Sequence, residues 1–176
     1  MLTILDAKKF DTVYALLEES FPPDERRTYE GQKALLKDAR YTVFTYEEDG
    51  EILAAMLTWN LDSALFLEHF AVFSKYRGKG LGARLLALLS EKAGRRICLE
   101  VEPPETEIAR RRIAFYERSG FSRNLFPYLQ PSLSEGKNPV PLQIMTTGGA
   151  LDEESFANIK KELYEKVYDY KEGVSL

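Results

Sequence analysis

The chain has 176 residues, of which 44% are hydrophobic and 12% aromatic, so it can bury the core of one domain. Its 24 basic and 28 acidic side chains give a formal net charge of −4, which argues against a general nucleic-acid-binding surface. A single cysteine and a single histidine exclude an intramolecular disulfide and a Cys/His zinc site built within the chain.

The distribution of apolar residues gives no sign of a targeting or membrane segment. No stretch reaches the about 18 apolar residues that would span a bilayer, and no apolar run follows a basic start. The lone thiol, Cys98, suits a reducing compartment. We therefore expect a cytoplasmic protein without a metal, which binds neither a membrane nor nucleic acid.

The first half of the chain is predicted to form a strand, two helices and three further strands. Residues 2–5 are a short apolar strand, and Asp6 can cap a helix that Pro22-Pro23 ends. A second, more polar helix is expected over 24–38. Residues 41–48 alternate as a strand does, Asp49-Gly50 is a hairpin turn signal, and the segments 52–61 and 64–73 are predicted to be the next two strands.

Helices and strands alternate through the second half. The predicted elements are, in order, a helix at 81–94, a strand at 97–101, a helix at 105–119, an extended segment from Phe121, a strand at 141–147 and a helix at 152–170. This order predicts one α/β (α+β) domain over 1–176, with a mixed, mostly antiparallel sheet flanked by helices.

The run Arg77-Gly78-Lys79-Gly80-Leu81-Gly82 lies where a predicted strand gives way to a helix. Glycines at such a junction let the backbone bend tightly and come close to a ligand. The N–H groups that open a helix carry partial positive charge, and Arg77 and Lys79 add full charges at the rim. The loop is therefore predicted to bind phosphates, in particular a pyrophosphate.

Known phosphate-binding patterns fit this loop to different degrees. A P-loop requires Lys-Ser or Lys-Thr after the glycines, and neither pair is present. The dinucleotide pattern G-x-G-x-x-G/A is met by Gly78, Gly80 and Ala83, and Glu100 or Glu102 stands near the distance of a ribose-binding acid. Hairpin-linked strands rather than repeated strand–helix–strand units precede the loop, which argues against a dinucleotide site.

A third pattern, R/Q-x-x-G-x-G/A, is met by Arg77, Gly80 and Gly82, and here the chain resembles the GCN5-related N-acetyltransferase (GNAT) family. The helix end Ala114-Phe115-Tyr116-Glu117-Arg118-Ser119-Gly120-Phe121 is similar to that family's A-x-Y-x-x-x-G-F. The resemblance covers about residues 1–147 and leaves out the helix at about 152–170. It implies transfer of an acetyl group from acetyl-CoA directly to a primary amine of a small molecule or peptide, and it allows for a homodimer.

The resemblance implies that acetyl-CoA binds along a bulged strand and the glycine loop. The implied cofactor-binding residues are Phe70, Ala71, Val72, Arg77, Gly78, Lys79, Gly80, Leu81, Gly82 and Arg112. A main-chain N–H near Val72 would polarise the thioester carbonyl. Ala109 stands where the family usually carries an Asn, and this departure leaves open a non-catalytic acyl-CoA-binding or regulatory module on the same fold.

Acetyl transfer to an amine needs a proton acceptor for the amine and a donor for the departing thiolate. Tyr116 is the candidate donor, because a phenol is protonated at neutral pH. Glu68 and Glu100 are alternative bases on neighbouring strands. We favour Glu68. Partial burial under CoA is expected to raise the pKa of this side chain. His69 competes with Glu68, because adjacent residues of a regular strand point to opposite faces.

The acceptor amine is left open by the sequence. Acidic residues such as Asp24, Glu25 and Glu30 would attract a cationic amine. Aromatic residues in the segments expected to select the acceptor are Phe21, Tyr29, Trp59, Phe126 and Tyr128.

Overall fold

The computed structural model describes residues 1–133 and 138–170, in which seven strands form one sheet in the order β1-β2-β3-β4-β5-β7-β6. Strands β4 and β5 pair in parallel, and the other neighbours pair antiparallel. The strands are β1 Leu2–Ile4, β2 Tyr41–Glu48, β3 Glu51–Asn60, β4 Leu65–Val72, β5 Ile97–Val101, β6 Phe121–Gln130 and β7 Val140–Thr147. The predicted mixed, mostly antiparallel sheet is confirmed.

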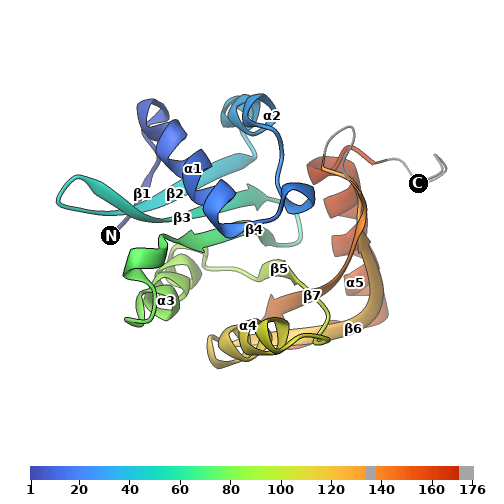
Figure 1. The fold of residues 1–176 in the computed structure, drawn as a ribbon. Helices are drawn as coiled ribbons and strands as arrows, with labels where there is room; N and C mark the ends of the chain where they lie inside the picture. Colours follow the sequence, from blue (N-terminus) through green and yellow to red (C-terminus); the bar gives the residue numbers. More distant parts are fainter. Residues whose placement is uncertain (134–137, 171–176) are drawn as a thin grey trace.

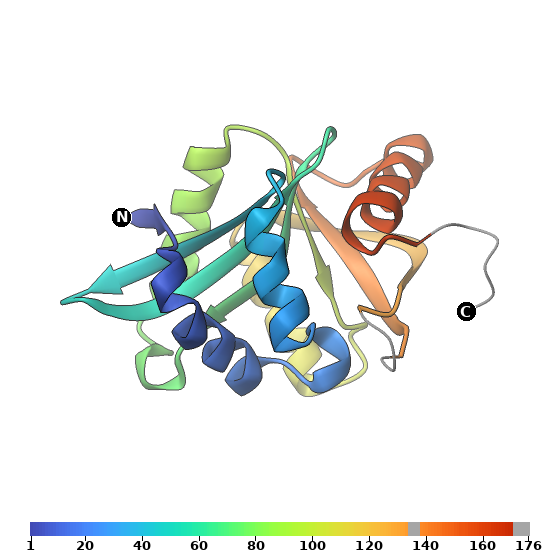
Figure 2. The same cartoon turned by 90° about the horizontal axis from the view of Figure 1, so that it is seen from above.

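Helices cover both faces of the sheet. They are α1 Phe10–Ser20, α2 Tyr29–Ala34, α3 Leu81–Ala93, α4 Glu107–Arg118 and α5 Glu153–Glu162. Helices α1 and α2 lie on one side of the sheet and α3 and α4 on the other (Figure 1), and each side buries its own apolar cluster. Helix α5 lies beside β6 and β7 at the far end of the sheet (Figure 2). Within the described residues, no helix is long and apolar enough to cross a membrane.

Local signals place most element ends where the sequence predicts them. Asp49 and Gly50 have φ values of 50° and 81°, as a tight hairpin turn requires. Gly94 ends α3 in the left-handed conformation. Asp152 caps the last helix by accepting a hydrogen bond from the N–H of Ser155, and that helix ends in a π-helical turn at Leu163–Val167.

The predicted helix over 24–38 is wrong as a continuous element. Residues 23–25 form one 3-10 turn, the chain is extended at Arg26, and α2 begins only after Thr28, whose side chain caps it. The interruption carries Arg27 into the interior, where it meets Glu68. A buried ion pair formed across 41 residues of sequence therefore overrides the local helical preference.

Strand β4 contains a bulge that the alternation rule does not anticipate. Leu57 of β3 pairs with His69 and Thr58 pairs with Leu67, so Glu68 is an extra residue without a partner. Glu68 and His69 consequently line the same cavity, and the expected placement on opposite faces is wrong.

The same bulge marks the point where two strands separate. Strands β4 and β5 pair only from Leu65–Ile97 to Leu67–Leu99. Glu68 and Glu100 are the first residues beyond the paired region on their respective strands. The sheet therefore opens a gap in its middle, with a glutamate at each edge.

Candidate active site

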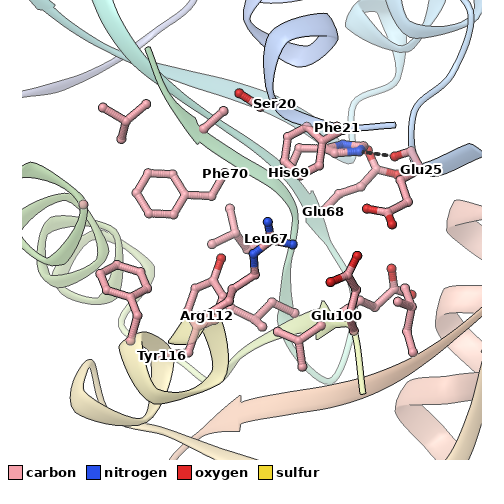
Figure 3. A pocket seen from close by; sticks show the side chains of 18 of the residues that line it. Ser20, Phe21, Glu25, Leu67, Glu68, His69, Phe70, Glu100, Arg112 and Tyr116 are labelled. Atoms are coloured by element: carbon pink, nitrogen blue, oxygen red, sulfur yellow. Dashed lines mark hydrogen bonds and ion pairs between the residues drawn. The ribbon is translucent and has the colours of Figure 1, made fainter. Parts of the chain in front are cut away.

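A cavity of about 340 Å³ occupies the gap between β4 and β5. Figure 3 shows Glu68 and His69 on one side of it, Arg112 and Tyr116 of α4 on another, and Glu100 of β5 directed into it. Its walls come from the end of α1, the bulged strand, β5, α4 and β6. The predicted site residues that line it are Glu68, Phe70, Ala71, Val72, Arg77, Gly82, Glu100, Arg112 and Tyr116.

The glycine loop forms the opening turn of α3 beside this cavity. Gly78 and Gly80 have φ values of 78° and 74°, which suit glycine, and Gly80 directly precedes the helix. A Cβ added at either position would meet no atom within 4 Å, so the space above the turn is open. At Gly82 a Cβ would lie 3.2 Å from the Phe115 ring, so this glycine allows α3 to approach α4 closely.

The three predicted cofactor-binding cations have different surroundings. The Arg77 Nε group donates to the Val72 carbonyl at 2.7 Å, and its guanidinium also contacts Ser20 and Glu19, so Arg77 fastens the loop to β4 and α1. Lys79 is exposed at the rim. Arg112 lines the cavity, whereas the neighbouring arginines of α4 bind main-chain carbonyls and Glu107 outside it.

Tyr116 stands on the buried side of α4, with its ring against Phe115 and Phe121. Its hydroxyl has no hydrogen-bond partner among residues 1–133 and 138–170, and the residue lines the cavity. Burial raises the pKa of Tyr116 to about 12, although Arg112 opposes the shift. The hydroxyl therefore keeps its proton at neutral pH and is available to donate it.

Glu68 is the anionic half of a buried ion pair. Its side chain is 1% exposed, and Oε1 lies 2.5 Å from Nη1 of Arg27, whose side chain is 7% exposed. Burial is the largest single influence and would raise the pKa of Glu68, but the charges of Arg27 and His69 and the polar contacts with both residues together lower the pKa from 4.5 to about 2. The expectation of a raised pKa at Glu68 is therefore wrong, because the sequence does not reveal its partner.

His69 is held on both sides of its ring. Nε2 lies 2.6 Å from the carbonyl oxygen of Glu25, which can only accept, so Nε2 carries a proton. Nδ1 faces Oε2 of Glu68 at 3.5 Å, and the ring packs edge-on against Phe21. The Nε2 contact with Glu25 and the packing against Phe21 fix the ring, whereas Nδ1 has no hydrogen-bond partner among the described residues.

Glu100 accepts hydrogen bonds only from neutral donors in the described part of the chain. Tyr128 donates to Oε1, Gln130 donates to Oε2 at 2.6 Å, and Tyr168 lies 2.9 and 2.8 Å from the two oxygens. Burial raises the pKa of Glu100, the three donors oppose the rise, and the nearby Glu68 charge adds to it. Glu100 and Glu68 both line the cavity, but only Glu68 has an ion-pair partner among the described residues.

A further acidic group, Glu25, lines the cavity. Burial raises the pKa of Glu25, the charge of Glu102 raises it further, and Arg112 partly offsets both effects. Glu25 and Glu102 both line the cavity. Of the aromatic residues expected to select the acceptor, Phe21 also lines it, whereas Tyr128 donates a hydrogen bond to Glu100.

Three residues of the site were missed from the sequence. Arg27 fell inside a predicted helix, Gln130 between the extended segment from Phe121 and the strand predicted at 141–147, and Tyr168 in a terminal helix without a family pattern. The donors to Glu100 are 28 to 68 residues away from it in the sequence, so no local motif signals them.

Burial raises the pKa of Cys98, which keeps that thiol protonated and unreactive.

Comparisons with known proteins agree with this geometry. The chain matches the model of the acetyltransferase (GNAT) family over residues 10–121. It is 29% identical over 162 residues to YjbC of Bacillus subtilis (strain 168), a provisionally named acetyltransferase, covering 90% of this chain and 82% of that one. A provisionally named GNAT-family acetyltransferase structure from Bacteroides thetaiotaomicron is 33% identical, with a TM-score of 0.89 over 97% of this chain and 99% of its own.

A more distant structure, a Bacillus subtilis acetyltransferase in complex with CoA, shares the fold with a TM-score of 0.60 at 14% identity over 83% of this chain and 96% of its own. The class defined by the fold and cavity is thus that of the acyltransferases. The family match covers well over half of the chain, and the chain belongs to the GNAT acetyltransferase family. Acetyl-CoA is the acyl donor of this family.

Proposed function

We propose that the protein transfers the acetyl group of acetyl-CoA directly to a primary amine, with Glu100 as the base and Tyr116 as the proton donor. The observation that carries this proposal is that one cavity is lined by a carboxylate without a cationic partner and by a tyrosine whose hydroxyl has no partner in the described residues. The glycine-rich opening of α3 beside the cavity suits the pyrophosphate of the donor.

An ammonium acceptor loses two protons on its way to the amide, and sulfur gains one. The first proton passes to the Glu100 carboxylate, directly or through a water, and the second passes to solvent as the amide forms. The amine nitrogen forms a bond with the thioester carbonyl carbon as the carbon–sulfur bond breaks. Tyr116 donates a proton to the departing thiolate and regains one from solvent. The products are an amide and free CoA.

Glu100 is preferred over Glu68 because of what surrounds each carboxylate. A base must be reachable and must have a pKa high enough to hold the proton it takes. Glu68 is enclosed and neutralised by Arg27, whereas Glu100 has a raised pKa and no ion-pair partner in the described residues. Glu25 and Glu102 beside it favour a cationic acceptor, either a small polyamine-like molecule or a peptide amine.

The experiment is a screen of polyamines, aminoglycosides, amino acids and peptides, read out as free CoA thiol, followed by pH–rate profiles with the best acceptor. Wild-type kcat/KM should rise with pH as Glu100 loses its proton, with an apparent pKa above the ordinary 4.5. Glu100→Gln should remove this rise, the ascending limb of the pH–rate profile, and lower kcat by about 10²–10⁴-fold.

Glu68→Gln is the matched control, because it removes the same charge from the adjacent strand edge. It is expected to lower stability and to leave the limb in place. Loss of the limb in Glu68→Gln but not in Glu100→Gln would exchange the two roles.

A non-catalytic acyl-CoA-binding module is a second candidate, and Ala109 favours it. This position is buried in α4, 1% exposed, and offers no polar group where the family usually carries an Asn. Such a module would bind acetyl-CoA in calorimetry and release no thiol with any amine in the screen.

A further inference from the structure

The chain beyond the family match reaches back to Glu100, a residue that lines the cavity. Helix α5 passes into the π-helical turn Leu163–Val167, and the next residue, Tyr168, contacts both oxygens of Glu100. The carbonyl of Val167 accepts a hydrogen bond from Arg27 at 3.1 Å. The family model ends at residue 121, so these contacts belong to a part of the chain that the family pattern does not describe.

The π-helical turn determines where Tyr168 points. The N–H of Tyr168 bonds to the carbonyl of Leu163 at 3.1 Å, five residues earlier, instead of four. One extra residue in a turn rotates the following side chain by about 100° relative to an uninterrupted α-helix. The wider turn therefore directs the Tyr168 hydroxyl to Glu100 while the preceding carbonyl meets Arg27.

Glu100 depends on neutral donors for its orientation. Glu68 is fixed by a guanidinium, but the described residues offer Glu100 no cation, only the hydroxyls of Tyr128 and Tyr168 and the amide of Gln130. Neutral dipoles favour the charged carboxylate without neutralising it, so it can still accept a proton. Tyr168 is the donor that contacts both oxygens, and therefore constrains the rotation of the carboxylate.

We propose that Tyr168 is a positioning residue that holds the Glu100 carboxylate toward the acceptor amine, so that the C-terminal segment completes the active site. This inference rests on the proposed role of Glu100 as the base. The other groups facing Glu100 are Glu68 of β4, Tyr128 and Gln130 of β6 and Cys98 of its own strand.

The test substitutes Tyr168→Phe, which keeps the ring and removes only the hydroxyl. Loss of a donor to the charged form raises the pKa of Glu100, so the limb of kcat/KM should move to higher pH. The freed carboxylate should also lower kcat by about 10-fold through misplacement of the base. CoA affinity, measured by calorimetry, should stay within about 2-fold, because Tyr168 acts at the acceptor end.

Tyr164→Phe is the matched control from the same C-terminal segment. Its hydroxyl donates to the carbonyl of Leu129. This variant should lose some thermal stability and keep the wild-type pH profile. Equal pH shifts in Tyr164→Phe and Tyr168→Phe would show that Tyr168 acts only through folding, and would overturn the inference.

A measurement independent of turnover separates this inference from the proposed function. The carboxyl carbon of Glu100, followed by NMR in the full chain, should titrate at higher pH in Tyr168→Phe than in the wild type and in Tyr164→Phe. An unchanged Glu100 titration in folded Tyr168→Phe overturns the positioning role. The other informative outcome is a shifted Glu100 titration in Tyr168→Phe together with a rise of rate with pH that persists in Glu100→Gln. This outcome overturns the assignment of Glu100 as the base, and the Tyr168–Glu100 hydrogen bond is then a structural contact without a catalytic role.

Discussion

At the scale of single residues, two glutamates in equivalent places acquire opposite properties. Glu68 and Glu100 each follow the last paired residue of adjacent parallel strands. Arg27 and His69 together lower the pKa of Glu68 to about 2 against the effect of burial, whereas burial raises the pKa of Glu100. The difference comes from partners brought by other elements, which is why the two carboxylates cannot be ranked from their strands alone.

Tyr116→Phe tests the other end of the proposed proton path. Removal of the hydroxyl leaves the packing against Phe115 and Phe121 intact but removes the donor to the thiolate. We expect kcat to fall about 10²-fold while KM for acetyl-CoA changes little, because the lost interaction is made in the transition state. Steady-state kinetics with the best acceptor measure both, and an unaltered kcat would reduce Tyr116 to a packing residue.

At the scale of elements, the start of α3 combines an open surface with backbone geometry that suits glycine. Gly80 precedes the first turn with φ of 74°, and α3 continues for 13 residues behind it. The first N–H groups of a helix lack partners within the helix, so the turn presents donors to a bound anion.

Gly80→Val should place a side chain in the space proposed for the pyrophosphate and weaken CoA binding at least 10-fold in calorimetry. The backbone strain at a positive φ also lowers stability, by about 1–2 kcal/mol. Gly94→Val is the control, because Gly94 has φ of 59° at the opposite end of the same helix and also has open space around it. Similar CoA affinities in the two folded variants would contradict a phosphate site at Gly80.

At the scale of the whole molecule, Arg27 connects parts that lie far apart in the sequence. It follows the first turn after α1, pairs with Glu68 in β4 and donates to Val167 near the C-terminal end. The Arg27 guanidinium also stands over the ring of Trp59 at 5.8 Å from its centre. One buried cation thereby ties the N-terminal, central and C-terminal parts of the fold together.

Arg27→Met should lower the free energy of unfolding by about 3–5 kcal/mol at pH 7, because it leaves Glu68 buried and unpaired. Since the pKa of Glu68 is lowered on folding, the pair stabilises the protein above pH 4.5 and loses that effect as pH falls toward about 2. Urea denaturation should therefore show the difference from wild type shrinking over this range. The double variant Arg27→Met/Glu68→Gln should recover much of the loss, and no recovery would show that Arg27 acts through other contacts.

Elements with local signals were predictable from the sequence, and contacts between distant segments were not. Local residue patterns predict the hairpin at Asp49-Gly50, the strand 97–101 and the glycine turn, and the structure contains each of them. The extended backbone at Arg26 and the bulge at Glu68 both accompany the Arg27–Glu68 pair, which only the folded chain assembles. The roles proposed for Tyr116, Glu68 and Glu100 remain predictions.

The three-pair junction between β4 and β5 divides the sheet into two halves joined along a short seam. One half carries β1–β4 and the other β5–β7, and the cavity continues the seam where the pairing stops. A molecule that binds in this gap contacts both halves of the sheet and connects them. Occupancy of the gap and the rigidity of the seam are then thermodynamically linked, so that filling the gap holds the two halves in register.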